Sequence, residues 1–169
     1  LRIRIMKSII RLLRLEKKFD LQIITQNVDD LHERAGCKNV LHLHGELKKV
    51  CSEVDSRDVR LLDGWELTED MKDNYGKPLR PHIVWFGESV PNIEPAIELC
   101  EQADIMIIIG TSLNVYPAAS LLNYTKKDCK KYLVDPNTIN IPDKNIVFVK
   151  QKAGVGVKQV VDEILEIYL

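Results

Sequence analysis

Apolar and polar residues alternate along the chain with two periods, one typical of α-helices and the other of β-strands. Helical spacing of apolar residues occurs around residues 6–13, 28–35, 93–100, 118–124 and 157–168. Short apolar or alternating runs lie between them, at 21–25, 39–44, 81–86, 105–109, 131–134 and 145–149. Strands that alternate with helices predict an α/β fold, a Rossmann-like parallel sheet with helices on both faces. The run 105–109 is apolar throughout, so we expect a central strand there.

The regular pattern is interrupted between residues 47 and 79. This segment is rich in charge, contains Gly64, Gly76 and Pro78, and shows little periodicity. We therefore predict a small loop-rich module there, with weak helix or strand content, inserted into a lobe formed by residues 1–46 and 80–169. We call residues 47–79 the small module.

Composition limits the classes of partner. The chain has 169 residues, 45% of them hydrophobic and 29% charged, and its formal net charge is −1. A nearly neutral chain produces no strong field toward nucleic acid or an anionic membrane, so we expect neither as a partner. No apolar run reaches the roughly 20 residues that span a bilayer, and the first residues lack a secretory pattern, so we expect a cytoplasmic protein. The sequence does not indicate the oligomeric state.

Polar side chains follow three of the predicted strands, at 25–29, 110–114 and 135–137. Ligands of open α/β sheets bind beyond the carboxyl ends of the strands, where short polar side chains can hold ribose hydroxyls, a carboxamide and phosphates. Turns use the same residue types for purely local reasons. From the residues alone, a nucleotide site and a coincidence are equally supported.

The histidines add a second candidate feature. His42 and His44 are two residues apart in a predicted strand, so we expect their rings on opposite faces, one in the core and one lining a cleft. Histidine is the commonest general base, although most histidines in folded chains have no catalytic role. His44 is the stronger candidate, and we expect His32 and His82 to be structural.

Several segments resemble the sirtuins in their order and spacing. They are TQNVD at 25–29, LHERAG at 31–36, HGEL at 44–47, VWFGE at 84–88 and GTS at 110–112. The forms of residues 79–88 and 114–119 are most similar to the class III, bacterial-type members. The resemblance implies an NAD-dependent protein-lysine deacylase of the deacetylase, desuccinylase or demalonylase type, which transfers the acyl group to ADP-ribose and releases nicotinamide.

The resemblance also implies roles for individual residues. His44 corresponds to the base that takes a proton from the NAD ribose, with Asn27 beside it as a second catalytic residue. The residues that bind nicotinamide and its ribose correspond to Gln26, Asn27, Val28 and Asp29. Those that bind the phosphates and the adenosine ribose correspond to Gly110, Thr111 and Ser112, and those that border the adenine end correspond to Asp135, Pro136, Asn137 and Ala153. The residues that bind the acylated-lysine protein substrate correspond to Val84, Trp85, Phe86, Gly87 and Glu88 on one side of the peptide and to Leu113, Asn114 and Val115 on the other. Such a clamp binds its peptide as an added strand.

The sequence departs from the sirtuin pattern in three ways. Sirtuins usually hold a structural zinc in the small module, but here Cys51 lacks its partner, because Val54 stands at the second position. We expect no metal, and a module held by packing around Leu61, Leu62 and Trp65. Asp135 replaces the usual Asn of the adenosine-ribose contact. The first strand with its Gly-rich phosphate loop is not in the sequence, so we expect these 169 residues to bind NAD poorly by themselves.

Two other functions remain open at this stage. One is an NAD-dependent protein mono-ADP-ribosyltransferase that uses the same site. The other is a catalytically impaired NAD-binding fragment or interaction module. Retention of His44 and of the peptide clamp favours the deacylase over the transferase.

Overall fold

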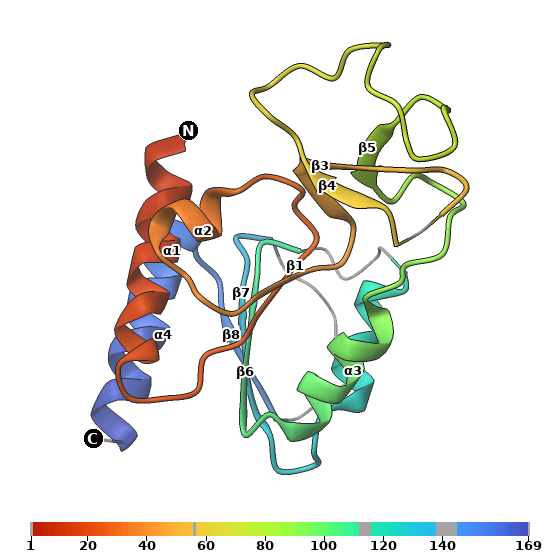
Figure 1. Ribbon diagram of the computed structural model, residues 1–169. Helices are drawn as coiled ribbons and strands as arrows, with labels where there is room; N and C mark the ends of the chain where they lie inside the picture. Colours follow the sequence, from red (N-terminus) through yellow and green to blue (C-terminus); the bar gives the residue numbers. More distant parts are fainter. Residues whose placement is uncertain (1, 56, 112–115, 138–144, 169) are drawn as a thin grey trace.

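The computed structural model describes residues 2–55, 57–111, 116–137 and 145–168 (Figure 1). Its first half contains α1 (Arg2–Glu16), β1 (Ile23–Thr25), α2 (Leu31–Ala35), β2 (Val40–His42), β3 (Gly45–Cys51), β4 (Val59–Leu61) and β5 (Arg80–Ile83). Its second half contains α3 (Ile93–Gln102), β6 (Ile105–Ile109), the 3-10 helix η1 (Ala118–Tyr124), β7 (Lys130–Val134), β8 (Ile146–Val149) and α4 (Ala153–Tyr168).

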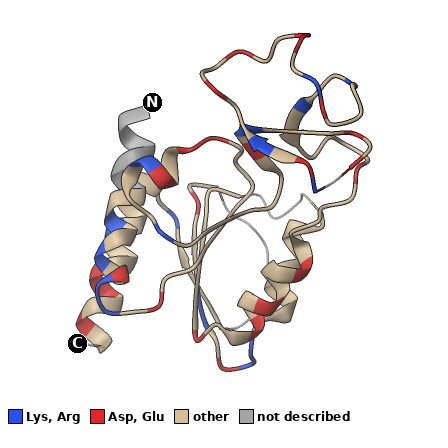
Figure 2. Cartoon of the chain, viewed as in Figure 1, with Lys and Arg blue, Asp and Glu red and all other residues tan. Residues whose placement is uncertain are grey.

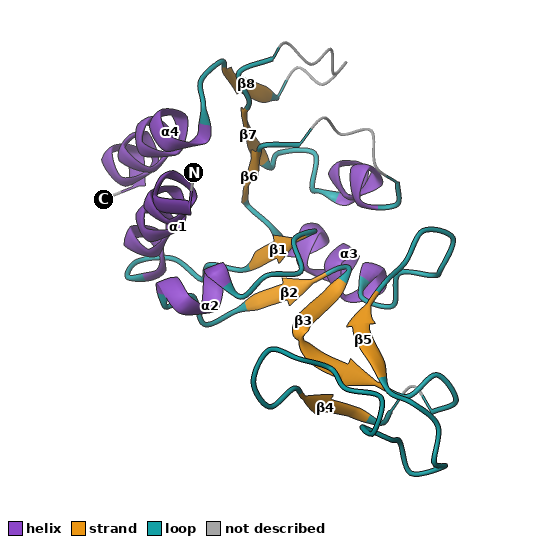
Figure 3. Ribbon diagram, turned by 90° about the horizontal axis from the view of Figure 1, so that it is seen from above, coloured by secondary structure: helices purple, strands orange, loops and turns teal. Residues whose placement is uncertain are grey.

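Parallel strands form the framework, as the alternating pattern predicted. β1 pairs with β2, and β6, β7 and β8 form a second parallel sheet in that order. Helices α1 and α4 lie on one side of these strands and α3 on the other (Figure 3). The α/β fold is therefore confirmed. The central position expected for β6 is not, since β7 lies in the middle of its sheet and is the more deeply buried strand.

The main core lies between α1, α4 and the strands β7 and β8. Its buried members are all apolar apart from the Tyr132 hydroxyl, namely Leu12, Leu15, Tyr132, Val134, Val149, Val157, Val160, Val161 and Ile164. Gly156 allows α4 to approach, because a Cβ there would come within 2.4 Å of a Val134 methyl group. A smaller apolar cluster on the other side joins Leu43, Ala96, Cys100 and Leu121.

The small module shares an antiparallel sheet, in the order β4, β3, β5, with the lobe as predicted, because β3 begins at Gly45 and β5 (Arg80–Ile83) lies beyond residue 79. Two of the three apolar anchors expected for the small module, Leu61 and Trp65, are wrong, while Leu62 is half-buried. Leu61 is 78% exposed and Trp65 is 81% exposed, with the Lys48 ammonium 3.4 Å from the centre of the Trp65 ring. Both side chains therefore lie on the outer surface of the small module, where most of their area is in contact with solvent.

Polar contacts hold the loops of the small module instead. The buried Ser52 hydroxyl donates to the buried Asp73 carboxylate at 2.6 Å and accepts from the amides of Val54 and Asp55 at 3.1 Å. The same carboxylate accepts from the amides of Tyr75 and Lys77, closing the turn before β5. The Ser52 hydrogen bond, more than the backbone bonds, lowers the pKa of Asp73. This carboxylate therefore joins two loops that are 21 residues apart.

Charges of both signs are interspersed over the small module (Figure 2). Among the described residues, no helix combines the length and the apolar character needed to span a bilayer. The cysteines Cys37, Cys51, Cys100 and Cys129 are all buried and free. Burial, and secondarily Cys129, raises the pKa of Cys100 to about 11, so this thiol is held in its protonated form.

Candidate functional site

Residues 25–29, which we call the TQNVD loop, leave the carboxyl end of β1. Thr25 is buried and its hydroxyl accepts a hydrogen bond from the Asn27 amide at 3.1 Å. The Asp29 carboxylate accepts from the Leu31 amide at 3.1 Å, at the start of α2, and Gly36 ends that helix at φ 101°. Asn27 is exposed, while Gln26, Val28 and Asp29 are half-buried. Short local bonds thus present polar side chains beyond the strand end.

His44 lies opposite the TQNVD loop, in the turn between β2 and β3. The expectation that His42 and His44 share a strand is wrong, because β2 ends at His42. The expectation of opposite faces is also wrong, since residues two apart in a strand lie on one face, and both rings contact carbonyls of the TQNVD loop. Nδ1 of His44 lies 3.2 Å from the Gln26 carbonyl oxygen. A carbonyl only accepts, so Nδ1 carries the proton and Nε2 of a neutral ring has a lone pair.

Gly45 connects this histidine to the small module. Its φ of 78° and its approach to β5 both require glycine, since a Cβ would lie 2.1 Å from the His82 carbonyl oxygen. The close approach lets the Val84 amide donate to the His44 carbonyl at 3.0 Å. The segment after β5 is therefore fixed directly to the backbone of the candidate base.

The segment Val84 to Glu88 presents large apolar side chains to solvent. Trp85 is 55% exposed and Phe86 is fully exposed. The Glu88 carboxylate accepts from the Trp85 amide at 3.0 Å and lies 3.4 Å from the Arg80 guanidinium, which fixes the turn around Gly87. The other expected half of the clamp, Leu113, Asn114 and Val115, lies outside the described residues, as does Ser112.

A second group of candidate residues lies at the carboxyl ends of β6, β7 and β8. The Gly110 amide donates to the Val134 carbonyl at 3.1 Å, and the Asp135 amide donates to the Val149 carbonyl at 3.3 Å, so adjacent strand ends are joined. The Asp135 carboxylate accepts from the Asn137 amide at 2.7 Å. Thr111 and Pro136 adjoin these residues, and Ala153 begins α4 directly after β8. β1 and β6 end on the same side of the molecule (Figure 1).

These positions fit the groups of a dinucleotide. The carboxylate of Asp135 uses one oxygen for the Asn137 amide, and its second oxygen can accept from ribose hydroxyls. Gly110 has no side chain and a φ of 62°, which leaves room for a ligand near the strand end. At the other group, the TQNVD loop offers amide and carboxylate side chains suited to a carboxamide and a ribose.

The two remaining histidines differ from the candidate base. Burial lowers the pKa of His32, partly offset by Glu33 and Asp29, and burial also lowers the pKa of His82. Among the residues that the structure describes, Nδ1 of each is buried without a hydrogen-bond partner. Both shifts favour the neutral ring, and the structural roles expected for these two histidines stay predictions.

Sequence reasoning missed the partners of His42. This ring is 5% exposed and contacts both the Asn27 carbonyl and the Glu33 carboxylate, while Asn92 at the start of α3 donates to the His42 carbonyl at 2.7 Å. An ionisable residue inside an otherwise apolar strand was the available signal, since a buried imidazole needs polar partners.

The described part of the small module, residues 47–55 and 57–79, does not contain the donor set of a structural zinc. Cys51 is buried with its thiol directed toward the Pro81 carbonyl, burial raises its pKa, and the exposed Val54 offers no ligand atom. Among the described residues, no three His, Cys, Asp or Glu side chains gather as a metal site would require. The residues therefore do not fit the zinc that sirtuins usually hold, and the expected absence of metal stays a prediction.

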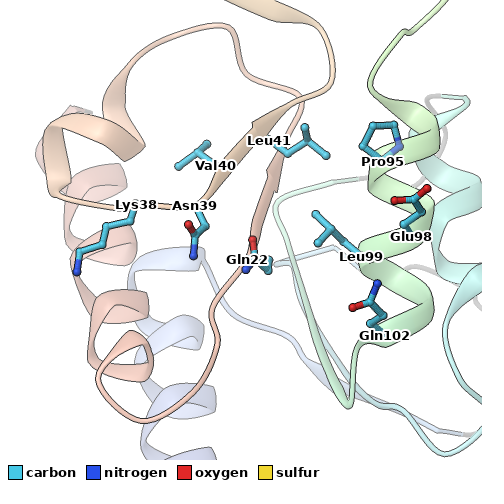
Figure 4. Close-up of a pocket in the computed structure, with 9 residues that line it drawn as sticks. All are labelled: Gln22, Lys38, Asn39, Val40, Leu41, Pro95, Glu98, Leu99 and Gln102. Atoms are coloured by element: carbon cyan, nitrogen blue, oxygen red, sulfur yellow. The ribbon is translucent and has the colours of Figure 1, made fainter.

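A pocket of about 390 Å³ lies elsewhere, between β2 and α3 (Figure 4). Its lining residues are Gln22, Lys38, Asn39, Val40, Leu41, Pro95, Glu98, Leu99 and Gln102. None of the residues predicted for the site lines it, and its rim is formed by exposed polar side chains.

Comparison with known proteins decides the family. Residues 3–117 match the sequence pattern of the Sir2 family. The chain belongs to the Sir2 family. A relative from Aggregatibacter actinomycetemcomitans, named NAD-dependent protein deacylase, is 57% identical over 126 residues, which cover 75% of this chain and 60% of the relative. A protein of the same name from Bacteroides thetaiotaomicron is 48% identical and covers 86% of this chain and 64% of its own length. The chain thus spans less than two thirds of the length of these two Sir2 relatives.

Solved Sir2 structures agree with the fold. A complex of a Sir2 homologue with NAD superposes with a TM-score of 0.80 at 33% identity, covering 97% of this chain and 65% of the other. A complex of Sir2 with a p53 peptide and NAD has a TM-score of 0.70 at 30% identity, covering 95% of this chain and 69% of the other. The arrangement of strands and helices described above is therefore the Sir2 arrangement.

Proposed function

We propose that this protein is a cytoplasmic NAD-dependent protein-lysine deacylase, which transfers an acetyl, succinyl or malonyl group from lysine to ADP-ribose and releases nicotinamide. The observation that carries the proposal is the position of His44, in a turn between the TQNVD loop and the segment 84–88. Its carbonyl binds the Val84 amide and its ring binds the Gln26 carbonyl. One residue thus contacts both the candidate cofactor loop and the candidate peptide segment.

His44 acts as the general base in this proposal. The Gln26 carbonyl holds the proton on Nδ1, so Nε2 is directed to take a proton from a ribose hydroxyl. Among the described residues, Nε2 has no hydrogen-bond partner that would occupy its lone pair. A ring fixed through its other nitrogen needs little reorganisation at the moment of proton transfer.

Two groups of side chains would hold NAD, which supplies the ADP-ribosyl acceptor and nicotinamide as leaving group. Gln26, Asn27, Val28 and Asp29 would surround the nicotinamide and its ribose. Gly110, Thr111 and Ser112 would contact the phosphates and adenosine ribose, and Asp135, Pro136, Asn137 and Ala153 would border adenine. Support comes from the shared orientation of the β1 and β6 ends and from the named NAD complex of a Sir2 homologue.

The acylated-lysine substrate would lie along residues 84–88, with Leu113, Asn114 and Val115 on its other side. Exposed backbone beyond β5 can pair with an extended peptide whatever its sequence. The exposed rings of Trp85 and Phe86 would lose water against the peptide or the lysine stem. Named Sir2 complexes with peptides support this assignment.

The proposal is tested on the full-length gene product by mass spectrometry of acetyl-, succinyl- and malonyl-lysine peptides, with and without NAD. We expect NAD-dependent deacylation that falls about 10²- to 10⁴-fold in His44→Ala, the usual contribution of a general base. Glu101→Ala, an exposed change on α3, serves as the control and should retain full turnover.

Three outcomes would contradict the deacylase. Turnover without NAD would remove the cofactor from the mechanism, and full turnover in His44→Ala would remove the base. ADP-ribose found on a protein acceptor, without loss of acyl groups from any peptide, would identify a mono-ADP-ribosyltransferase instead.

A further inference from the structure

The TQNVD loop is attached to the segment 42–47 by its backbone carbonyls, one after another. The carbonyl oxygens of residues 25, 26, 27 and 28 each accept a hydrogen bond from that segment. The donors are, in order, the Leu43 amide at 2.9 Å, the His44 ring at 3.2 Å, the His42 ring at 2.9 Å and the Leu47 amide at 2.8 Å. With its carbonyls engaged on this side, the loop can offer its side chains to a ligand.

His42 makes the third of these bonds and is itself held on its far side. Nδ1 lies 2.9 Å from the Asn27 oxygen, and Nε2 lies 2.9 Å from a carboxylate oxygen of Glu33 on α2. The Asn27 carbonyl can only accept, which assigns a proton to Nδ1. An ionised carboxylate also only accepts, so the Glu33 contact is a hydrogen bond when Nε2 carries a proton and the ring a positive charge.

The two partners are exposed to different degrees. The His42 side chain is 5% exposed, whereas that of Glu33 is 40% exposed. Loss of the ring would leave the Asn27 carbonyl without its donor, facing whatever side chain fills the buried position 42. Loss of the carboxylate would free the ring to tilt but would admit water. The effect of Glu33 should therefore be the smaller, and it should act through His42.

We propose that His42 and Glu33 form a positioning pair that sets the orientation of Asn27 for the nicotinamide half of NAD. The inference rests on the proposed function for its ligand, but its geometry stands on the hydrogen bonds alone. The pair contacts the backbone of the loop and no part of the segment 84–88 in the described residues. It should therefore affect NAD and leave the acylated peptide unaffected.

Steady-state kinetics on the full-length gene product give the first test. In His42→Leu, which keeps the volume but removes both donors, we expect the KM for NAD to rise roughly tenfold or more, as loss of a buried hydrogen-bond partner predicts. In Glu33→Ala we expect a rise of roughly two- to fivefold, with Glu33→Gln, which can still bond the ring, restoring most of the loss. The KM for peptide should be unchanged in all three.

Amide hydrogen exchange without NAD gives a second test that is independent of activity. The amides of Leu43 and Leu47 bond to the carbonyls of Thr25 and Val28, so they report opening of the loop. They should exchange several-fold faster in Glu33→Ala than in the wild type or in the control Glu101→Ala. His42→Leu could unfold the chain, but Glu33→Ala, at an exposed position, should not.

The outcomes separate this inference from the proposed function. A wild type without NAD-dependent turnover, in which Glu33→Ala still accelerates exchange of Leu43 and Leu47, refutes the deacylase and supports the positioning pair. Unchanged exchange in Glu33→Ala overturns the pair, whatever the activity. Equal rises in the KM for NAD and for peptide would also overturn it, because they would indicate a general structural defect.

Discussion

The parallel lobe is held by a large apolar core, whereas the small module adds a buried polar link to the few apolar side chains that it buries, Val50, Cys51 and Leu79. Between α1, α4 and the strands β7 and β8, the fully buried side chains are apolar, with Ile164 and Val160 at 1% and 0% exposure. In the small module the buried link between loops is the Ser52 hydroxyl on the Asp73 carboxylate, while Leu61 and Trp65 lie on the surface. A short segment has too little volume for an apolar core, so directional bonds must specify its shape.

The largest effect should follow from removing apolar volume in the lobe. Ile164→Ala deletes buried methyl and methylene groups from α4, and we expect a loss of about 2–5 kcal/mol in the free energy of unfolding. Urea denaturation followed by circular dichroism measures it. Leu61→Ala is the matched change in the small module and should cost less than about 0.5 kcal/mol, because that side chain is exposed. If both variants lost the same free energy of unfolding, the lobe and the small module would not differ in their dependence on apolar packing.

An intermediate effect should follow from removing the polar link of the small module. Ser52→Ala leaves Asp73 without its buried donor and the amides of Val54 and Asp55 without their acceptor. We expect a loss of about 1–3 kcal/mol, together with faster hydrogen exchange at those two amides. Ser89→Ala, at an exposed position, is the control.

The Ser52→Ala variant also distinguishes stabilisation of the small module by the polar link from stabilisation by a bound metal. With no zinc donor set in the described residues, we expect a chelator to leave the unfolding midpoint of the wild type unchanged. A midpoint that falls on chelation, and that Ser52→Ala does not alter, would show that a bound metal holds the small module.

The difference between the two regions also explains how far the sequence allowed prediction. β6 was predicted at its observed bounds, Ile105–Ile109, because every residue in it is apolar. β3 was missed, since its register shifts between Gly45 and Val50 and the shift breaks the alternation that identifies strands. Periodicity reports burial of apolar side chains, and the small module buries few of them.

The candidate site shows the same limit. Residues of the TQNVD loop and His44 were found because their residue types form a familiar ordered pattern. The contact between His42 and Glu33 joins residues nine positions apart through a turn and a short helix, and neither residue type alone predicts it. Such a pair follows from the path of the chain, which local spacing does not determine.

The smallest effect should come from Trp65, and it gives the sharpest test of the comparison. Contact with the Lys48 ammonium at an exposed site is worth about 0.5–1 kcal/mol, part of which solvent offsets, so Trp65→Ala should cost no more than about 0.5 kcal/mol. In a Trp85→Phe background, the remaining fluorescence reports Trp65 alone and should be quenched readily by iodide. A loss above about 2 kcal/mol, with fluorescence shielded from iodide, would mean that this ring anchors an apolar core. The small module would then be stabilised in the same way as the lobe, and its polar links would be secondary.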